Sequence, residues 1–215
     1  MFMGLPPGPR CVAMKVPLNV FKGLTPLVLG ILMVLVGNFE MGACVYVALH
    51  GSYGIMWVLK GLLFPDKKWE EKVTIPSIIL ISLALIMYWR TGWVVITTKP
   101  YISPIRAGLA VFLHTMGLVM MIASDTQKYF TLKYKPGLIT EGWFSRSRNT
   151  NYLGEVFLYC SYCIMAQDMV SWLFCTTIWC TYFLKNILDK ENSLKKKKGW
   201  QEYVSKSNMF LPKIF

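Results

Sequence analysis

The residues best able to do chemistry form one polar stretch, Arg148 to Glu155, at the start of an otherwise apolar segment. A carboxylate at the centre of a membrane helix costs about 2.5 to 3.5 kcal/mol, so Glu155 should face protein, water or a ligand. If this stretch is helical, Asn151 and Glu155 share a face, with Tyr152 three residues before Glu155. The three side chains would then converge, and an amide and a carboxylate can match the donor and the acceptor of a ligand carboxamide.

Cations in the preceding polar connection offer the complementary chemistry for phosphate groups. Guanidinium and ammonium groups bind phosphate oxygens through charge-assisted hydrogen bonds. The candidates are Lys128, Lys133, Arg146 and Arg148, and Tyr203 in the tail is placed to close the same site. No glycine-rich dinucleotide fingerprint accompanies them.

A simpler interpretation of the same stretch remains open. Asn149 or Thr150 would cap a helix, and Arg148 would pair with Glu155 at the membrane boundary. In that case the polar residues would only start the helix and would bind no ligand.

Composition predicts an integral membrane protein. Hydrophobic residues make up 54% of the 215 residues and charged residues only 16%, against about 25% charged residues in an average soluble domain. The basic residues concentrate beside apolar segments: of the 23 Lys and Arg, five lie in 128–148 and seven in 190–213. This pattern indicates membrane orientation and attraction to anionic lipid or to a phosphorylated cofactor, and it does not suggest nucleic-acid binding.

We expect an all-α, polytopic helical bundle with five or six membrane segments, because about 20 apolar residues are needed for each span. Residues 1–24 are expected to form a basic N-terminal arm, and residues 25–215 are expected to form a single membrane domain. Residues 25–49 are expected to form one long helix or, because residues 37–40 interrupt the apolar pattern, a helix and a kinked continuation. Residues 51–63 are too short to cross and are expected to form a half-span or a continuation of that first segment. Spans are expected over 76–98 and 105–124, and a polar connection over 125–151.

The last apolar segment, 152–186, is too long for one span and holds a single acid, Asp168. It predicts two helices joined at Gln167 and Asp168. Such a hairpin places the connection before it and the tail after it, which are the two basic segments, on one membrane face.

The C-terminal part of the chain, residues 125–215, resembles the steroid 5-alpha-reductase superfamily of membrane reductases. The resemblance rests on Ser124-Asp125-x-x-Lys128, on residues 137–144 (Gly-Leu-Ile-Thr-Glu-Gly-Trp-Phe), on residues 147–155 (Ser-Arg-Asn-Thr-Asn-Tyr-Leu-Gly-Glu), and on Lys198-Gly199-Trp200-x-x-Tyr203 with Pro212. Two features depart from the family pattern. Thr150 stands where the family most often has Pro, and lysines stand where it has a histidine-bearing motif.

The resemblance implies a membrane enzyme that holds NADPH and reduces a carbon-carbon double bond in a lipid or steroid-like substrate. It implies a cofactor site that includes Asp125, Lys128, Arg146, Arg148, Asn151, Tyr152, Glu155 and Tyr203. Reduction also needs a proton donor, and Glu40, His50 and Tyr53 are the catalytic candidates in the early membrane segments. The resemblance implies the endoplasmic reticulum, with the mitochondrial inner membrane as the alternative.

Two other functions fit the sequence. Isoprenylcysteine and phospholipid methyltransferases of the membrane have a similar C-terminal motif and bind S-adenosylmethionine, although they usually have a histidine at the position of Asn149. A non-catalytic subunit that packs with other membrane subunits, for example in a respiratory complex, is the third reading. No metal site is expected, because Cys160 and Cys163 form a single CxxC spacing with no histidine nearby.

Overall fold

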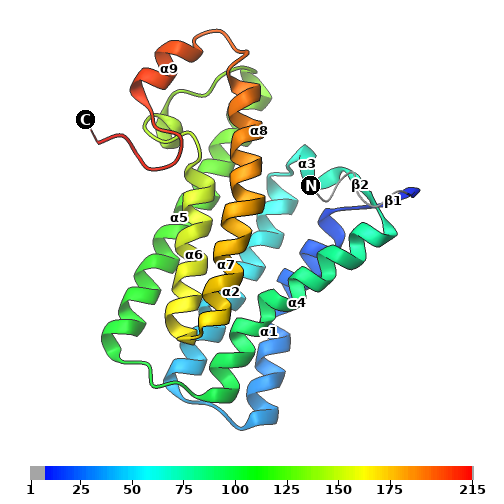
Figure 1. Cartoon of the computed structure of the whole chain (residues 1–215), viewed down its shortest axis with the longest axis vertical. Coiled ribbons are helices and arrows are strands. Elements are labelled where there is room, and N and C mark those ends of the chain that lie inside the picture. The colour runs from blue at the N-terminus through cyan, green and yellow to red at the C-terminus, as the bar shows by residue number, and fades with distance from the viewer. Residues whose placement is uncertain (1–7, 215) are drawn as a thin grey trace. The chain divides into compact units, whose positions relative to one another are not determined.

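The computed structural model describes residues 8–214, and helices make up most of that part of the chain (Figure 1). It divides into two compact units. Unit 1 holds the described residues up to Val111 together with Ser161–Trp172, and unit 2 holds Phe112–Cys160 and the described residues from Leu173 onward. The predicted all-α membrane fold is confirmed.

Four helices are long and apolar enough to cross a membrane within the described residues: α1 (Lys15–Val36), α2 (Met41–Leu63), α4 (Ile75–Thr98) and α5 (Pro104–Tyr134). Many of their large apolar side chains are exposed; Leu35, for example, is 78% exposed. Such surfaces are suited to lipid, and the chain is therefore an integral membrane protein.

Unit 1 is built on the mutual packing of α1, α2 and α4. Pro26 inside α1 has no backbone N–H to donate to the carbonyl of Lys22. The backbone of α2 comes very close at this point, because a Cβ at Gly54 would lie 2.1 Å from the oxygen of that carbonyl. Only glycine permits this crossing.

The helix boundaries in unit 1 decide between the alternatives left open for residues 25–63. The segment 51–63 is not a half-span, because it belongs to helix α2, which runs unbroken from Met41 to Leu63. The chain breaks before α2, at Gly37, which has a φ of 66°, and Asn38 holds the turn by donating from Nδ2 to the carbonyl of Ile96 at 2.8 Å. The predicted interruption at residues 37–40 is therefore the end of α1.

The predicted basic arm is partly structured. Residues 1–7 lie outside the described part of the chain. Strand β1 (Arg10–Ala13) pairs antiparallel with β2 (Lys72–Thr74), which follows the short helix α3 (Lys67–Glu70), and α1 already begins at Lys15. The last ten residues of the predicted arm, 15–24, therefore belong to the membrane helix α1.

Six further helical elements follow in the described residues, and α6 and α7 are shared between the two units. Their bounds are η1 (Gly142–Phe144), α6 (Thr150–Ala166), α7 (Met169–Ile178), the π-helix η2 (Trp179–Phe183), α8 (Leu184–Leu194) and α9 (Trp200–Lys206). Helix α5 runs to Tyr134, so the polar connection begins about ten residues later than predicted, and Asp125 and Lys128 are helical. Helices α5 and α6 touch through glycine: a Cβ at Gly117 would lie 2.5 Å from the carbonyl oxygen of Gly154.

The predicted hairpin is confirmed. Helix α6 ends at Ala166, Gln167 takes a positive φ of 52°, and α7 begins at Met169. The carboxylate of Asp168 accepts a hydrogen bond from the backbone N–H of Ser171 at 2.7 Å and pairs with the guanidinium of Arg90. The single acid of the apolar segment thus starts α7 and is neutralised by a cation of α4.

Candidate functional site

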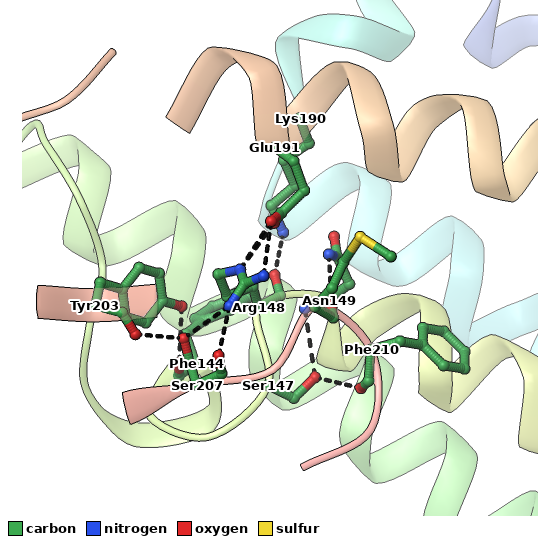
Figure 2. Close-up of polar contacts among 10 residues, drawn as sticks. Phe144, Ser147, Arg148, Asn149, Lys190, Glu191, Tyr203, Ser207 and Phe210 are labelled. Atoms are coloured by element: carbon green, nitrogen blue, oxygen red, sulfur yellow. Dashed lines mark hydrogen bonds and ion pairs between the residues drawn. The ribbon is translucent and has the colours of Figure 1, made fainter. Parts of the chain in front are cut away.

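Arg148 is the centre of a buried network that joins the start of α6 to α8 and to the C-terminal segment (Figure 2). Its Nε donates to the two carboxylate oxygens of Glu191 at 3.0 and 2.9 Å, and its Nη2 lies 2.8 Å from Glu191 Oε2. Its Nη1 donates to the carbonyl oxygen of Ser207 at 2.6 Å. All three guanidinium nitrogens therefore bind groups of the chain itself, in what we call the Arg148 clamp (Arg148, Glu191 and Ser207).

The C-terminal segment, residues 207–214, runs along residues 146–149 and is held there mainly by its carbonyl oxygens. The backbone N–H of Arg148 donates to Asn208, and the Nδ2 of Asn149 donates to Met209, at 3.0 and 2.8 Å. Further bonds join Ser147 Oγ to the carbonyl of Phe210 at 2.6 Å and Arg146 Nη1 to the carbonyls of Lys213 and Ile214 at 3.0 and 3.1 Å. Arg146, predicted to bind phosphate, thus holds this segment.

Tyr203 anchors α9 to η1. Its hydroxyl donates to the carbonyl oxygen of Phe144 at 2.7 Å, and burial raises the pKa of its phenol well above its usual range. The side chain therefore stabilises the fold around the clamp in this state, and its hydroxyl is engaged within the chain.

Lys190 on α8 is a cation of the site that the sequence reasoning missed. Its Nζ donates to the carbonyl oxygen of Arg148 at 2.6 Å and lies 5.2 Å from the centre of the Phe144 ring. Burial, with the charge of Lys128, lowers the pKa of Lys190 to about 8, and the charge of Asp125 acts in the opposite direction. The charges of Asp125 and Lys128 on α5 therefore act on a lysine that contacts the main chain of Arg148. No local sequence pattern marks Lys190.

Asn151, Tyr152 and Glu155 lie together in the first turns of α6, so the helical spacing expected of them is confirmed. The ring of Tyr152 packs 5.1 Å, centre to centre, from that of Phe183 in η2, and the charge of Glu155 acts on the phenol of Tyr182. The simpler reading paired Arg148 with Glu155, but Arg148 pairs with Glu191 instead. A π-helix such as η2 is rare and often marks a functional site.

Two side-chain oxygens near the clamp have no hydrogen-bond partner among residues 8–214. They are Oδ1 of Asn149 and Oδ1 of Asn151, and both atoms are buried. A buried acceptor left unsatisfied costs about 1 to 3 kcal/mol. A ligand that donates hydrogen bonds to these oxygens would recover that free energy.

The proton-donor candidates belong to unit 1. His50 Nδ1 lies 3.0 Å from the hydroxyl of Tyr46, and Tyr53 accepts a hydrogen bond from Lys22 Nζ at 2.6 Å. His50 and Tyr53 are both fully buried and both pack against Tyr88. Glu40 is exposed and precedes α2, about 15 Å from His50 along the helix axis. The structure brings His50 and Tyr53 together and separates Glu40 from them.

The buried partner of Tyr53, Lys22, is a second residue that the sequence reasoning missed. Its ammonium lies 3.4 Å from the centre of the Trp57 ring. The charge at position 22 was assigned to the arm, although helix α1 carries it into the interior of unit 1. Among the described residues, no group of three or more His, Cys, Asp or Glu side chains is arranged to hold a metal ion.

Comparison with known proteins places the chain in a family. The family described as a protein of unknown function, DUF1295, matches residues 75–207, which is well over half of the chain and includes every residue of the clamp. No curated protein matches the sequence. The chain therefore belongs to the DUF1295 family.

Proposed function

We propose that this protein is an NADPH-dependent membrane reductase of a carbon-carbon double bond in a lipid or steroid-like substrate. The observation that carries the proposal is the pair of buried, unsatisfied oxygens of Asn149 and Asn151 beside the cations of the clamp region. Natural proteins rarely leave such groups unpaired, and exceptions often mark functional sites.

The residues present fit a phosphorylated nicotinamide cofactor, which would supply the hydride. The amide NH2 of a nicotinamide can donate to an asparagine oxygen, and Asn151 shares the first turns of α6 with Tyr152 and Glu155. Lys128 and Lys190 supply positive charge close by. The resemblance to steroid 5-alpha-reductases supports the same assignment, with the endoplasmic reticulum as the proposed location and the mitochondrial inner membrane as the alternative.

A non-catalytic membrane subunit is the second candidate, and one observation favours it. Arg146 and Arg148, two of the cations predicted to bind phosphate, are engaged by the chain's own carbonyl and carboxylate groups. A protein that kept the fold for packing against other subunits would use its polar residues in this way.

Substituting Asn151 by leucine separates these functions. Because Asn151→Leu removes a buried unsatisfied acceptor, we expect the ligand-free protein to become more stable by about 1 to 2 kcal/mol. The same change should abolish stabilisation by NADPH, which for wild type reaches about 2.7 kcal/mol at a concentration of 100 times Kd. Thermal unfolding of the protein in lipid nanodiscs, with and without NADPH, measures both effects.

The exposed residue Asn192 on α8 provides the matched control, since Asn192→Leu should change neither quantity. If NADPH does not stabilise wild type, the reductase proposal is wrong. Stabilisation by S-adenosylmethionine alone would favour a methyltransferase, and co-purified membrane subunits with no response to either ligand would favour the structural role.

A further inference from the structure

Lys190 carries hydrogen-bonding capacity that the chain does not use. An ammonium has three donors, and in the described residues this one makes a single hydrogen bond, to the carbonyl of Arg148, and no ion pair. Its neighbour Glu191 acts on it through charge but forms no ion pair with it, and both carboxylate oxygens of Glu191 bind the guanidinium of Arg148. A half-buried cation with unused donors is suited to an anion that comes from outside the chain.

The balance of charges around Lys190 also favours the binding of an anion. The charged groups that act on Lys190 are Asp125 and Lys128 from α5, Arg148 from the start of α6, and Glu191 from α8. With Lys190 itself, three cations face two carboxylates, which leaves one net positive charge in a partly buried place. A bound anionic oxygen would neutralise it.

Both arginines of the region are committed elsewhere. All three guanidinium nitrogens of Arg148 are engaged in the clamp, and the Nη1 of Arg146 binds two carbonyls of the C-terminal segment. In Figure 2, Lys190 reaches from α8 to the main chain of Arg148, directly before Asn149 with its unsatisfied oxygen. Lys190 is thus the cation best placed to contact an anion beside an acceptor.

We infer that Lys190 binds a phosphate group of the dinucleotide, with Lys128 adding positive charge, and that Arg146 and Arg148 position the surrounding backbone without contacting the phosphate. The inference rests on the proposed function. It assigns the phosphate contact to a residue that the sequence reasoning did not select. Asn149 then accepts a hydrogen bond from a hydroxyl or amide group of the same ligand.

The test measures the affinity of the nanodisc-embedded protein for NADPH between pH 6.5 and 9.5. Because a half-buried lysine with a pKa of about 8 loses its charge in this range, wild-type affinity should fall as the pH rises through about 8. Lys190→Met should bind about 10- to 100-fold more weakly at pH 7, as expected for a lost charge-assisted hydrogen bond, with a flat pH profile. Lys190→Arg should keep the affinity at pH 7 and lose the pH dependence, since arginine stays charged.

Two matched variants control the measurement. Lys185→Met lies on the same helix, where Lys185 forms an exposed pair with Asp189, and it should leave affinity and pH profile unchanged. Lys128→Met should weaken binding and move the fall in affinity to a higher pH, because the charge of Lys128 lowers the pKa of Lys190. If Lys190→Met does not fold, the profile of Lys190→Arg decides.

Three ligands identify the source of the phosphate. NADPH and NADH differ by the ribose 2′-phosphate. If Lys190→Met lowers the affinity for NADH less than the affinity for NADPH, Lys190 contacts that phosphate. If it lowers both affinities equally, Lys190 contacts the diphosphate. The third ligand is phosphatidic acid in the nanodisc. If it competes with NADPH only when Lys190 is present, the anion bound by Lys190 is a lipid headgroup, and the nucleotide assignment is wrong. Unchanged NADPH binding by Lys190→Met also overturns the inference while the proposed function stands, whereas absence of NADPH binding by wild type removes both.

Discussion

Glu191→Ala is expected to destabilise the protein by about 3 to 5 kcal/mol, because it leaves the buried guanidinium of Arg148 without its counter-charge. Both members of this pair are almost fully buried, with side-chain exposures of 7% each. The loss should appear as a shift of the unfolding midpoint in detergent titrated with sodium dodecyl sulfate. Helix α8 and the C-terminal segment should lose amide protection first, since Arg148 holds both.

Two variants show whether this loss reflects the buried charge. Asp189→Ala, two residues earlier on α8, removes the carboxylate of an exposed pair with Lys185 and should change stability by less than about 1 kcal/mol. The double variant Arg148→Met with Glu191→Leu should recover most of the loss, because no unpaired charge remains. If the double variant is as unstable as Glu191→Ala, the buried charge is not the cause.

Gly117→Ala is expected to destabilise unit 2 by about 1 to 3 kcal/mol or more, because the added methyl overpacks the contact of α5 with α6. The new Cβ would lie 2.5 Å from the carbonyl oxygen of Gly154 and 2.9 Å from the backbone nitrogen of Leu158. Backbone atoms cannot rotate away, so the two helices must separate. Unfolding in the same detergent titration measures the effect.

Gly108→Ala on the same helix is the matched control, since a Cβ there meets nothing within 4 Å. It should stabilise the protein by up to about 1 kcal/mol through the lower entropy of the unfolded chain. Gly154→Ala should resemble Gly117→Ala, and the double variant should cost less than the sum, because one helix displacement relieves both clashes. Strict additivity would contradict a shared contact.

The features predicted correctly from the sequence depend on local composition. The hairpin at Gln167 and Asp168 follows from an apolar segment too long for one span with one acid inside it. The membrane class follows from hydrophobicity, and the shared helix of Asn151 and Glu155 follows from adjacency. None of these requires knowing which distant residues contact each other.

The features that were missed depend on distant residues. The partner of Arg148, Glu191, is 43 positions away, whereas the sequence suggested Glu155 in the same polar stretch. The residues 51–63 looked too short to cross a membrane, because the sequence does not show that they continue a helix that starts at Met41. Lys190 was not predicted as a site residue, because the sequence does not distinguish it from the other lysines of the basic segment 190–213. Hydropathy identifies the membrane segments, but it does not show which residues of different segments contact each other.

The way in which residues 207–214 complete the surroundings of Arg148 has a consequence for the order of folding. Their hydrogen bonds to Arg148, Asn149 and Ser147 join residues 59, 60 and 63 positions apart. Contacts this distant form late, because the intervening loop must first be closed, whereas the α6–α7 hairpin needs only neighbouring residues. We therefore expect a folding intermediate in which the hairpin is inserted and Arg148 is still exposed, so that the Arg148 clamp forms only in the last step of folding.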